Sequence, residues 1–157
     1  MRNMLFLVLL CGSCALAQPS VGVHTGILIP TGEFAQTYSL SPAVGVDILV
    51  PFLFGHLESS LEYVFLTTES ENRSAYMIPV LFGGRMCFGS LYFGGGVALH
   101  TLKWEEAGQE EKTSEFGGYW NIGTDVLIFN RDIEIAWKIH LLDFDDTVLS
   151  LSAGTYF

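Results

Sequence analysis

The sequence alternates large apolar residues with small or polar ones through eight segments that are separated by turn residues. The last segment is a clear example, because residues 149–157 read Leu-Ser-Leu-Ser-Ala-Gly-Thr-Tyr-Phe and end on an aromatic residue. A period of two residues is that of a β-strand, whereas an amphipathic helix repeats every 3.6 residues. The alternation therefore predicts an all-β chain.

The connections between these segments also alternate in character. The predicted strands are residues 20–29, 43–52, 57–65, 76–88, 91–100, 115–128, 132–141 and 149–157. The turns after the second, fourth and sixth strands are tight, while the other connections are mostly longer and more polar. An even number of strands with short turns at one end and longer loops at the other predicts an antiparallel up-and-down barrel.

The two faces of the predicted strands differ in composition. One face carries β-branched and aromatic residues, and the other is rich in glycine, alanine and serine with sparse charges of both signs, as a narrow interior requires. Because buried charges must be paired, we predict a salt-bridged network in the lumen. Its predicted members are Asp47, Glu58, Glu62, Arg85, Asp125, Glu134 and Lys138.

The amino-terminal residues predict export. Arg2 precedes the apolar run 4–10, and Ala15-Leu16-Ala17 forms a cleavage pattern, so residues 1–17 are predicted to be a signal peptide and residues 18–157 a single barrel domain. After Gln18 no apolar stretch reaches the 18 residues that a spanning helix needs, although the mean hydropathy is +0.40. Closed barrels are the other structure that satisfies its backbone in lipid.

Three motifs are the most telling for the fold: the opening segment 23–34 (VHTGILIPTGEF), Gly94-Gly95-Gly96 and the terminal phenylalanine. In these motifs the chain resembles the small eight-stranded outer-membrane barrels of the OmpA-like, OmpX-like and opacity-type group. The resemblance implies a monomer in the bacterial outer membrane, surrounded by outer-membrane lipid and lipopolysaccharide. It also implies that Tyr156 and Phe157 form a C-terminal sorting signal for the barrel-assembly machinery.

The acidic residues are concentrated in one stretch. The net charge of −10 argues against binding to nucleic acid. Glu105, Glu106, Glu110 and Glu111 crowd the stretch before the sixth strand, which we predict to be the longest outward loop and the best candidate for a functional surface. This loop either repels anionic surfaces, or collects divalent cations between itself and lipopolysaccharide, or is simply a solvated tip.

No residue is predicted to be catalytic, to ligate a metal or to bind a cofactor. Three of the four histidines lie on different predicted strands and His56 lies in a turn. No H-x-H spacing occurs, and the C-x-x-C at residues 11–14 lies in the predicted signal peptide. A structural or surface-interaction role is therefore predicted. The alternatives are a small pore, a lipid-modifying barrel enzyme, for which no serine lies close to His140 in the sequence, and a secreted soluble barrel that binds a small apolar ligand.

Two further features concern the strand ends. Aromatic residues are predicted to form two girdles at the ends of the barrel wall. Pro79 lies within the fourth predicted strand, where it cannot donate to a ladder, so we expect a bulge or a register break there. The predicted girdle residues are Tyr63, Phe65, Tyr76, Trp104, Phe116 and Trp120 at the outer end, and Phe52, Phe88, Phe129 and Phe157 at the inner end.

Overall fold

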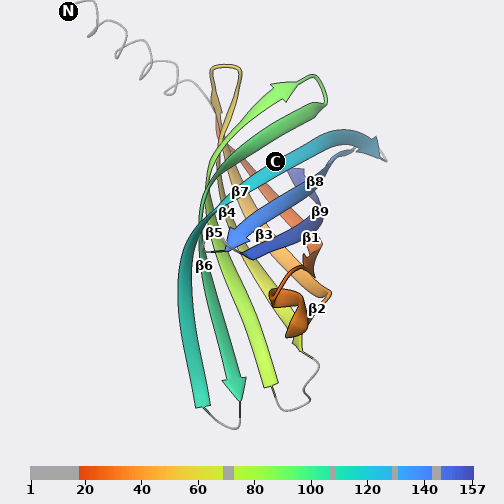
Figure 1. The fold of residues 1–157 in the computed structure, drawn as a ribbon. Coiled ribbons are helices and arrows are strands. Elements are labelled where there is room, and N and C mark those ends of the chain that lie inside the picture. Colours follow the sequence, from red (N-terminus) through yellow and green to blue (C-terminus); the bar gives the residue numbers. More distant parts are fainter. Residues whose placement is uncertain (1–17, 69–72, 107–108, 129–130, 143–145) are drawn as a thin grey trace, which may run out of the picture.

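The strands of the chain close into a single antiparallel barrel. The computed structural model describes residues 18–157 except 69–72, 107–108, 129–130 and 143–145 (Figure 1). The elements are β1 (Ser20–Pro30), the 3-10 helix η1 (Phe34–Gln36), β2 (Tyr38–Ser39), β3 (Ser41–Phe52), β4 (Gly55–Thr68), β5 (Arg73–Phe88), β6 (Leu91–Glu106), β7 (Gln109–Ile128), β8 (Arg131–Leu142) and β9 (Asp146–Tyr156). Eight long strands each pair with their neighbours in the chain, and β9 pairs with β1, while the short β2 pairs with β4. The predicted eight-stranded up-and-down barrel is confirmed.

Both ends of the barrel domain lie beside the tight turns. Two residues connect β3 to β4 and two connect β5 to β6, with Gly89 at a φ of 66° in the second turn. The amide of Phe157 donates to the carbonyl of Val21 at 2.9 Å, which fixes the last residue to the start of β1. The longest connection between described barrel strands is 31–40, which carries η1 and β2 near the other end of the barrel (Figure 1).

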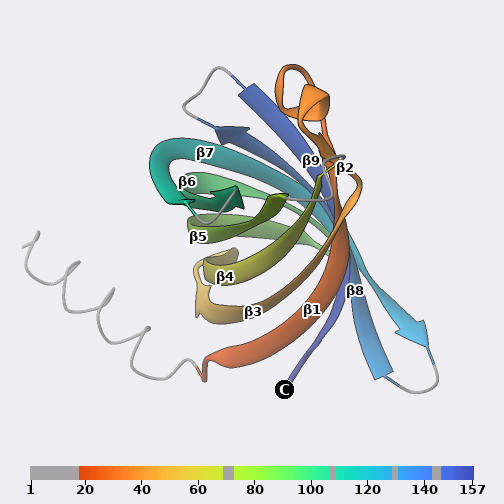
Figure 2. The same ribbon diagram turned by 90° about the horizontal axis from the view of Figure 1, so that it is seen from below.

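The strand register defines the tilt of the strands. Successive cross-strand partners, followed once around the barrel, return to β1 ten residues further along the chain. A stagger of this size requires strands tilted by about 35–45° to the barrel axis, and an eight-stranded barrel has an interior that side chains can fill. Figure 2 shows the strands curving around this interior. The path runs Ser20, Leu49, Glu58, Gly83, Gly96, Tyr119, His140, Val148 and Pro30.

The period of two residues determines which side chains face the interior. On β3 the exposed fractions of Val46 and Ile48 are 42% and 47%, whereas Asp47 between them is 3% exposed. The same alternation follows the other long strands, with glycine, tyrosine and charged residues inside and branched or aromatic residues outside. The sequence pattern therefore predicts the facing of the strands correctly.

Pro79 interrupts one ladder without changing its register. Leu61 pairs with Val80 and Val64 pairs with Met77, so the register on the two sides of the proline is the same. The two intervening pairs, Glu62–Pro79 and Tyr63–Ile78, are missing from the ladder, because proline has no backbone N–H to donate. The expected bulge or register break is wrong, since the ladder tolerates the loss of one donor.

The aromatic residues only partly follow the predicted girdles. Tyr63 and Tyr76 stack on the outward face with ring centroids 5.1 Å apart, and Phe65 packs edge-on against Tyr63. Trp104 instead packs against buried residues inside the barrel, because it occupies an inward position of β6. Phe129 lies outside the described residues. The outer girdle therefore contains fewer residues than predicted.

Candidate functional site

The barrel interior is built in layers that differ in chemistry. Successive inward-facing residues of β8 belong to successive layers, in the order Glu134, Lys138, His140 and Leu142. All four side chains are buried. One strand therefore contributes a carboxylate, an ammonium group, an imidazole and an apolar side chain at increasing distance from the tight turns.

The layer nearest the tight turns holds a cation between aromatic rings. Arg85 donates from Nη1 to Oε2 of Glu134 at 2.5 Å, and its guanidinium lies 4.3 Å from the ring centroid of Tyr92. The Tyr92 hydroxyl donates to the other carboxylate oxygen of Glu134 at 2.8 Å. The hydroxyl of Tyr156 lies 3.2 Å from the same oxygen, so this residue of the predicted sorting signal also contributes to the interior.

The next layer holds Lys138 among carboxylates. Its ammonium group donates to Glu62 at 2.6 Å and lies 4.0 Å from Asp47. His24 bridges the same two acids, with Nδ1 2.7 Å from Asp47 and Nε2 3.5 Å from Glu62. Such a compact buried network satisfies charges that would be costly to bury alone.

Glu58 contacts an amide instead of a cation. Asn121 donates to Glu58 at 2.9 Å across the interior. The structure therefore places six of the seven predicted network residues inside the barrel, namely Asp47, Glu58, Glu62, Arg85, Glu134 and Lys138.

The assignment of Asp125 to this network is wrong. Asp125 is exposed, because the β6–β7 ladder ends at the pair Leu91–Thr124 and β7 continues past the end of β6. In Figure 2 the end of β7 and the start of β8 project away from the barrel. The period of two residues gives the correct parity for Asp125 but not the point at which the strand leaves the barrel wall.

A histidine pair that the sequence did not single out lies in the next layer. Nε2 of His100 lies 3.4 Å from Nδ1 of His140, and Nε2 of His140 lies 3.2 Å from the hydroxyl of Ser150. All three side chains are buried. Ser150 comes from the neighbouring strand β9, so cross-strand register supplies a serine that is absent near His140 in the sequence.

An apolar cluster fills the interior at the end opposite the tight turns. The connection 31–40 contributes Tyr38 to this outer cluster and packs Phe34 against it. The buried members are Leu28, Tyr38, Ala43, Val64, Leu66, Ala75, Met77, Leu142 and Val148. The strand members occupy inward positions of the alternating pattern, so parity alone could have revealed the cluster. The outer cluster closes the polar interior with a layer of hydrocarbon.

Comparison with known proteins gives matches by structure alone. No protein-family model matches the chain, and no curated protein matches its sequence. Neisserial surface protein A (NspA) superposes with a TM-score of 0.68 at 10% identity, covering 89% of this chain and 97% of that protein. The N-terminal β-barrel domain of Pseudomonas aeruginosa OprF gives 0.58 at 13% identity, with 90% and 99% covered. Ail, the attachment invasion locus protein of Yersinia pestis, gives 0.55 at 19% identity, with 90% and 97% covered.

The fold is that of the small outer-membrane β-barrels. This likeness extends over nearly the whole length of each of these structures. It agrees with the resemblance that the sequence motifs indicate, and it concerns the architecture of the chain.

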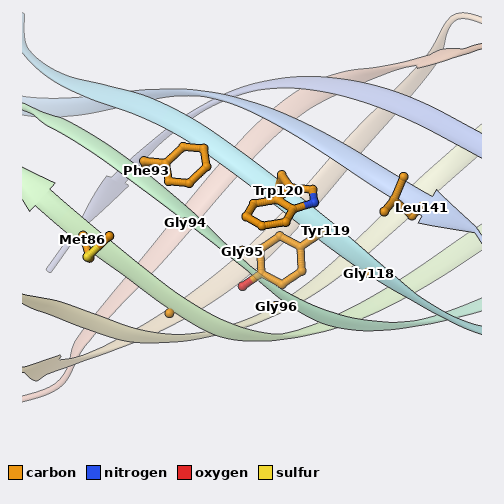
Figure 3. Close-up of a pocket in the computed structure, with 10 residues that line it drawn as sticks. Met86, Phe93, Gly94, Gly95, Gly96, Gly118, Tyr119, Trp120 and Leu141 are labelled. Carbon is orange, nitrogen blue, oxygen red and sulfur yellow. The ribbon is translucent and has the colours of Figure 1, made fainter. Parts of the chain in front are cut away.

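Part of the wall of this outer-membrane-type barrel is made of glycine. Gly83 and Gly96 are cross-strand partners, and a Cβ atom at Gly83 would lie 2.7 Å from the hydroxyl oxygen of Tyr119. On the outward face a Cβ atom at Gly95 would lie 2.9 Å from the indole of Trp120. Figure 3 shows Tyr119 and Trp120, consecutive residues of β7, beside Gly95 and Gly96 of β6. The glycines let large rings pack directly on the backbone of the wall.

The predicted acidic loop is a strand hairpin. β6 and β7 remain paired out to Glu106 and Gln109, so their connection is only 107–108, and the longest described connection is 31–40. The predicted loop is wrong because both faces of these hairpin strands meet water. The strands therefore need no apolar face, and their sequence lacks the alternation of a strand although the backbone pairing continues. Residues 107–108 and the side chain of Glu106 lie outside the described structure.

The charges on this acidic hairpin partly neutralise one another. Glu105 lies directly opposite Glu110, and Lys103 lies opposite Lys112. Lys103 donates to Glu110 at 2.9 Å, and this hydrogen bond lowers the pKa of the Glu110 carboxyl. The pairing offsets the repulsion between like charges on facing strands.

Two kinds of feature are absent from the described residues. No group of three or more histidine, cysteine, aspartate or glutamate side chains in this part of the chain is arranged to hold a metal ion. No helix among the same residues is long and apolar enough to cross a membrane.

Proposed function

We propose that the chain is an integral protein of the bacterial outer membrane with a structural or surface-interaction role. The observation that carries this proposal is the inverted distribution of polarity. Among the described residues, 27 large hydrophobic side chains are exposed while twelve polar or charged side chains are buried. Water would not support such an outward surface, whereas lipid would.

The same distribution argues against a secreted soluble barrel. Such a protein would bury its apolar face around an apolar ligand and expose its polar face. Here the middle of the interior holds Lys138, Glu62, Asp47 and His24 instead. A small apolar ligand would have to displace paired charges to enter.

The membrane location is tested by cell fractionation combined with gel migration. We expect the protein to require detergent for extraction and to migrate faster on a gel before heating than after it. Recovery from the periplasm without detergent would contradict the proposal. Tyr156 and Phe157 are proposed to act in recognition by the assembly machinery, and the protein is proposed to be a monomer in contact with lipid and lipopolysaccharide.

The interior is proposed to be a plug that does not conduct. Ion pairs fill the middle of the lumen, and the outer cluster adds an apolar layer that a hydrated ion would have to cross. A small pore, the alternative function, would need a continuous polar path. The proposal therefore predicts that conductance appears only when both the apolar layer and the ion-pair layer are opened.

Conductance through a planar lipid bilayer tests the apolar layer. The wild-type barrel and the double variant Leu28→Ser with Met77→Ser are expected to show no discrete current steps, because the ion pairs still fill the middle of the lumen. Adding Lys138→Ala to the double variant is expected to produce current steps, because it also removes the central cation. Leu81→Ser is the control, since Leu81 belongs to a separate buried cluster with Tyr119. Wild-type current steps of the same size would favour the pore.

A lipid-modifying enzyme is the remaining alternative. Ser150, His140 and His100 lie within hydrogen-bonding range in series, which is the arrangement of an activated nucleophile. All three, however, are buried inside the barrel, below the outer cluster, where a lipid substrate on the outward face cannot contact the serine hydroxyl. We therefore propose a role without catalysis.

The outer surface is proposed to repel polyanions. Ail is known in complex with the heparin analogue sucrose octasulfate, and that structure superposes on this chain with a TM-score of 0.52 at 16% identity. The acidic hairpin of the present chain would oppose such a ligand, because it exposes Glu105, Glu110 and Glu111. Screening limits this field to about 10 Å at 0.1 M salt. The hairpin thus repels polyanions only when they are already close to the surface of the barrel.

Retention on a heparin column tests this selection. The wild-type protein in detergent is expected to elute without retention at 0.1 M salt. A variant with glutamine at Glu105, Glu106, Glu110 and Glu111 is expected to elute later. The control changes Asp125 and Asp132, which are exposed on the hairpin at the other end of the barrel, to asparagine. Equal retention of wild type and the glutamine variant would mean that the acidity serves only solubility.

A further inference from the structure

The β4–β5 ladder contains a specific weak point at Pro79. Among the described residues, this is the one place where a ladder between barrel strands is interrupted internally. Pro79 keeps its pairing with His100 on β6, so the donor that it lacks is on the side of β4. The ladder therefore cannot supply a donor to the carbonyl of Glu62, which lies opposite the proline.

An apolar groove borders this interruption on the outward face. The groove has a volume of about 460 Å³ and extends over β1, β3, β4 and the edge of β5. Tyr63 and Ile78 line it, and they are the second pair that is missing from the ladder. The other outward-facing side chains that line the groove are Val23, Val44, Val46 and Leu61. The groove thus ends at the weak point of the wall.

The interior layer that holds Lys138 among carboxylates lies directly behind the interrupted part of the β4–β5 ladder. Glu62, whose carbonyl faces Pro79, binds Lys138 through its carboxylate at 2.6 Å and lies 3.5 Å from His24. At its outer end the lumen is closed by the outer cluster. The groove, the interrupted ladder and the charged layer are therefore adjacent.

We propose that the groove binds one hydrocarbon chain of a membrane lipid, and that the wall opens first between Glu62–Tyr63 and Ile78–Pro79, beside that chain. The occupant follows from continuity, since the groove belongs to the outward apolar surface and its polar members His24 and Glu62 direct their side chains inward. This inference rests on the proposed membrane location. It singles out one of several grooves on the outward surface, because this groove borders the interrupted ladder.

Lipid contact is tested by nuclear magnetic resonance in bilayer discs. The probe is a phosphatidylcholine with a nitroxide at the middle of one acyl chain, added at a low fraction of the lipid. The amide signals of Tyr63 and Ile78 are expected to broaden at least twofold more than those of Ile139 and Leu149. These two are cross-strand partners on β8 and β9, on the opposite wall, where the ladder is continuous. Equal broadening of both pairs would overturn the groove but keep the membrane location, whereas no broadening of either would contradict the location itself.

Amide exchange with deuterated water tests the weak point. In the wild type, the amides of Glu62 and Val64 are expected to exchange faster than those of Ile139 and Leu149. Pro79→Val supplies an N–H, and the added ladder hydrogen bond should slow exchange at Glu62 and Val64 by about tenfold. Pro79→Ala restores the same donor with a smaller side chain. Pro42→Val is the control, since Pro42 precedes the first β3–β4 pair, Ala43–Val64. Equally slow exchange on both walls of the wild type would overturn the proposal, as would a lack of response to both Pro79 variants.

Discussion

Replacing Lys138 with methionine is expected to lower the free energy of unfolding by about 3–5 kcal/mol. The side chains have similar length, so the change removes the ammonium group and leaves most of the packing. Glu62 and Asp47 would then remain buried with His24 as their nearest positively chargeable partner. Urea titration of the refolded barrel in lipid vesicles, followed by tryptophan fluorescence, measures this loss.

Two further variants separate the buried charge from general effects of the substitution. Lys112→Met removes an exposed lysine and is expected to change stability by less than about 1 kcal/mol. Adding Glu62→Gln to Lys138→Met removes the partner as well and should recover part of the loss. If Lys138→Met and Lys112→Met were equally mild, the interior would be hydrated and the plug would lose its support.

The facing of the strands could be predicted from the sequence because one rule governs it. Side chains alternate between the two faces of a strand, so Asp47 points to the face opposite that of Val46 and Ile48, whichever strands pair with β3. The closed barrel then follows from eight such strands, since an apolar outward face in lipid leaves no room for an unpaired edge. Local pattern and global architecture agree in this fold.

The partners inside the barrel could not be predicted, because they depend on register. Lys138 contacts Glu62, which is 76 residues away in the chain, and Arg85 contacts Glu134, which is 49 residues away. A shift of two residues in one ladder would preserve every facing and change both pairs. The sequence thus indicated that charges are inside but not which ones meet.

The ends of the strands were also beyond the sequence pattern. Asp125 has inward parity yet lies past the end of β6, and the acidic residues near 105–111 continue the ladder although their polarity suggests a loop. Outside the apolar band both faces of a strand meet water, so the alternation that marks a strand disappears. Backbone pairing leaves no compositional signal there.

Replacing Ile48 with arginine is expected to lower the free energy of unfolding by about 2–4 kcal/mol in lipid vesicles. Ile48 is exposed on the outward face of β3, where it lies close to the middle of the outward positions of the strand. A guanidinium at the centre of the hydrocarbon layer loses its hydration, and the cost falls to about 0–1 kcal/mol near the interfaces. Gln109→Arg at the start of β7, on the exposed acidic hairpin, is the control and should leave stability nearly unchanged. Urea titration of the three proteins in the same vesicles gives the comparison. Equal tolerance at the two positions would mean that the outward face of β3 is not in lipid, because an aqueous surface accepts arginine at either site.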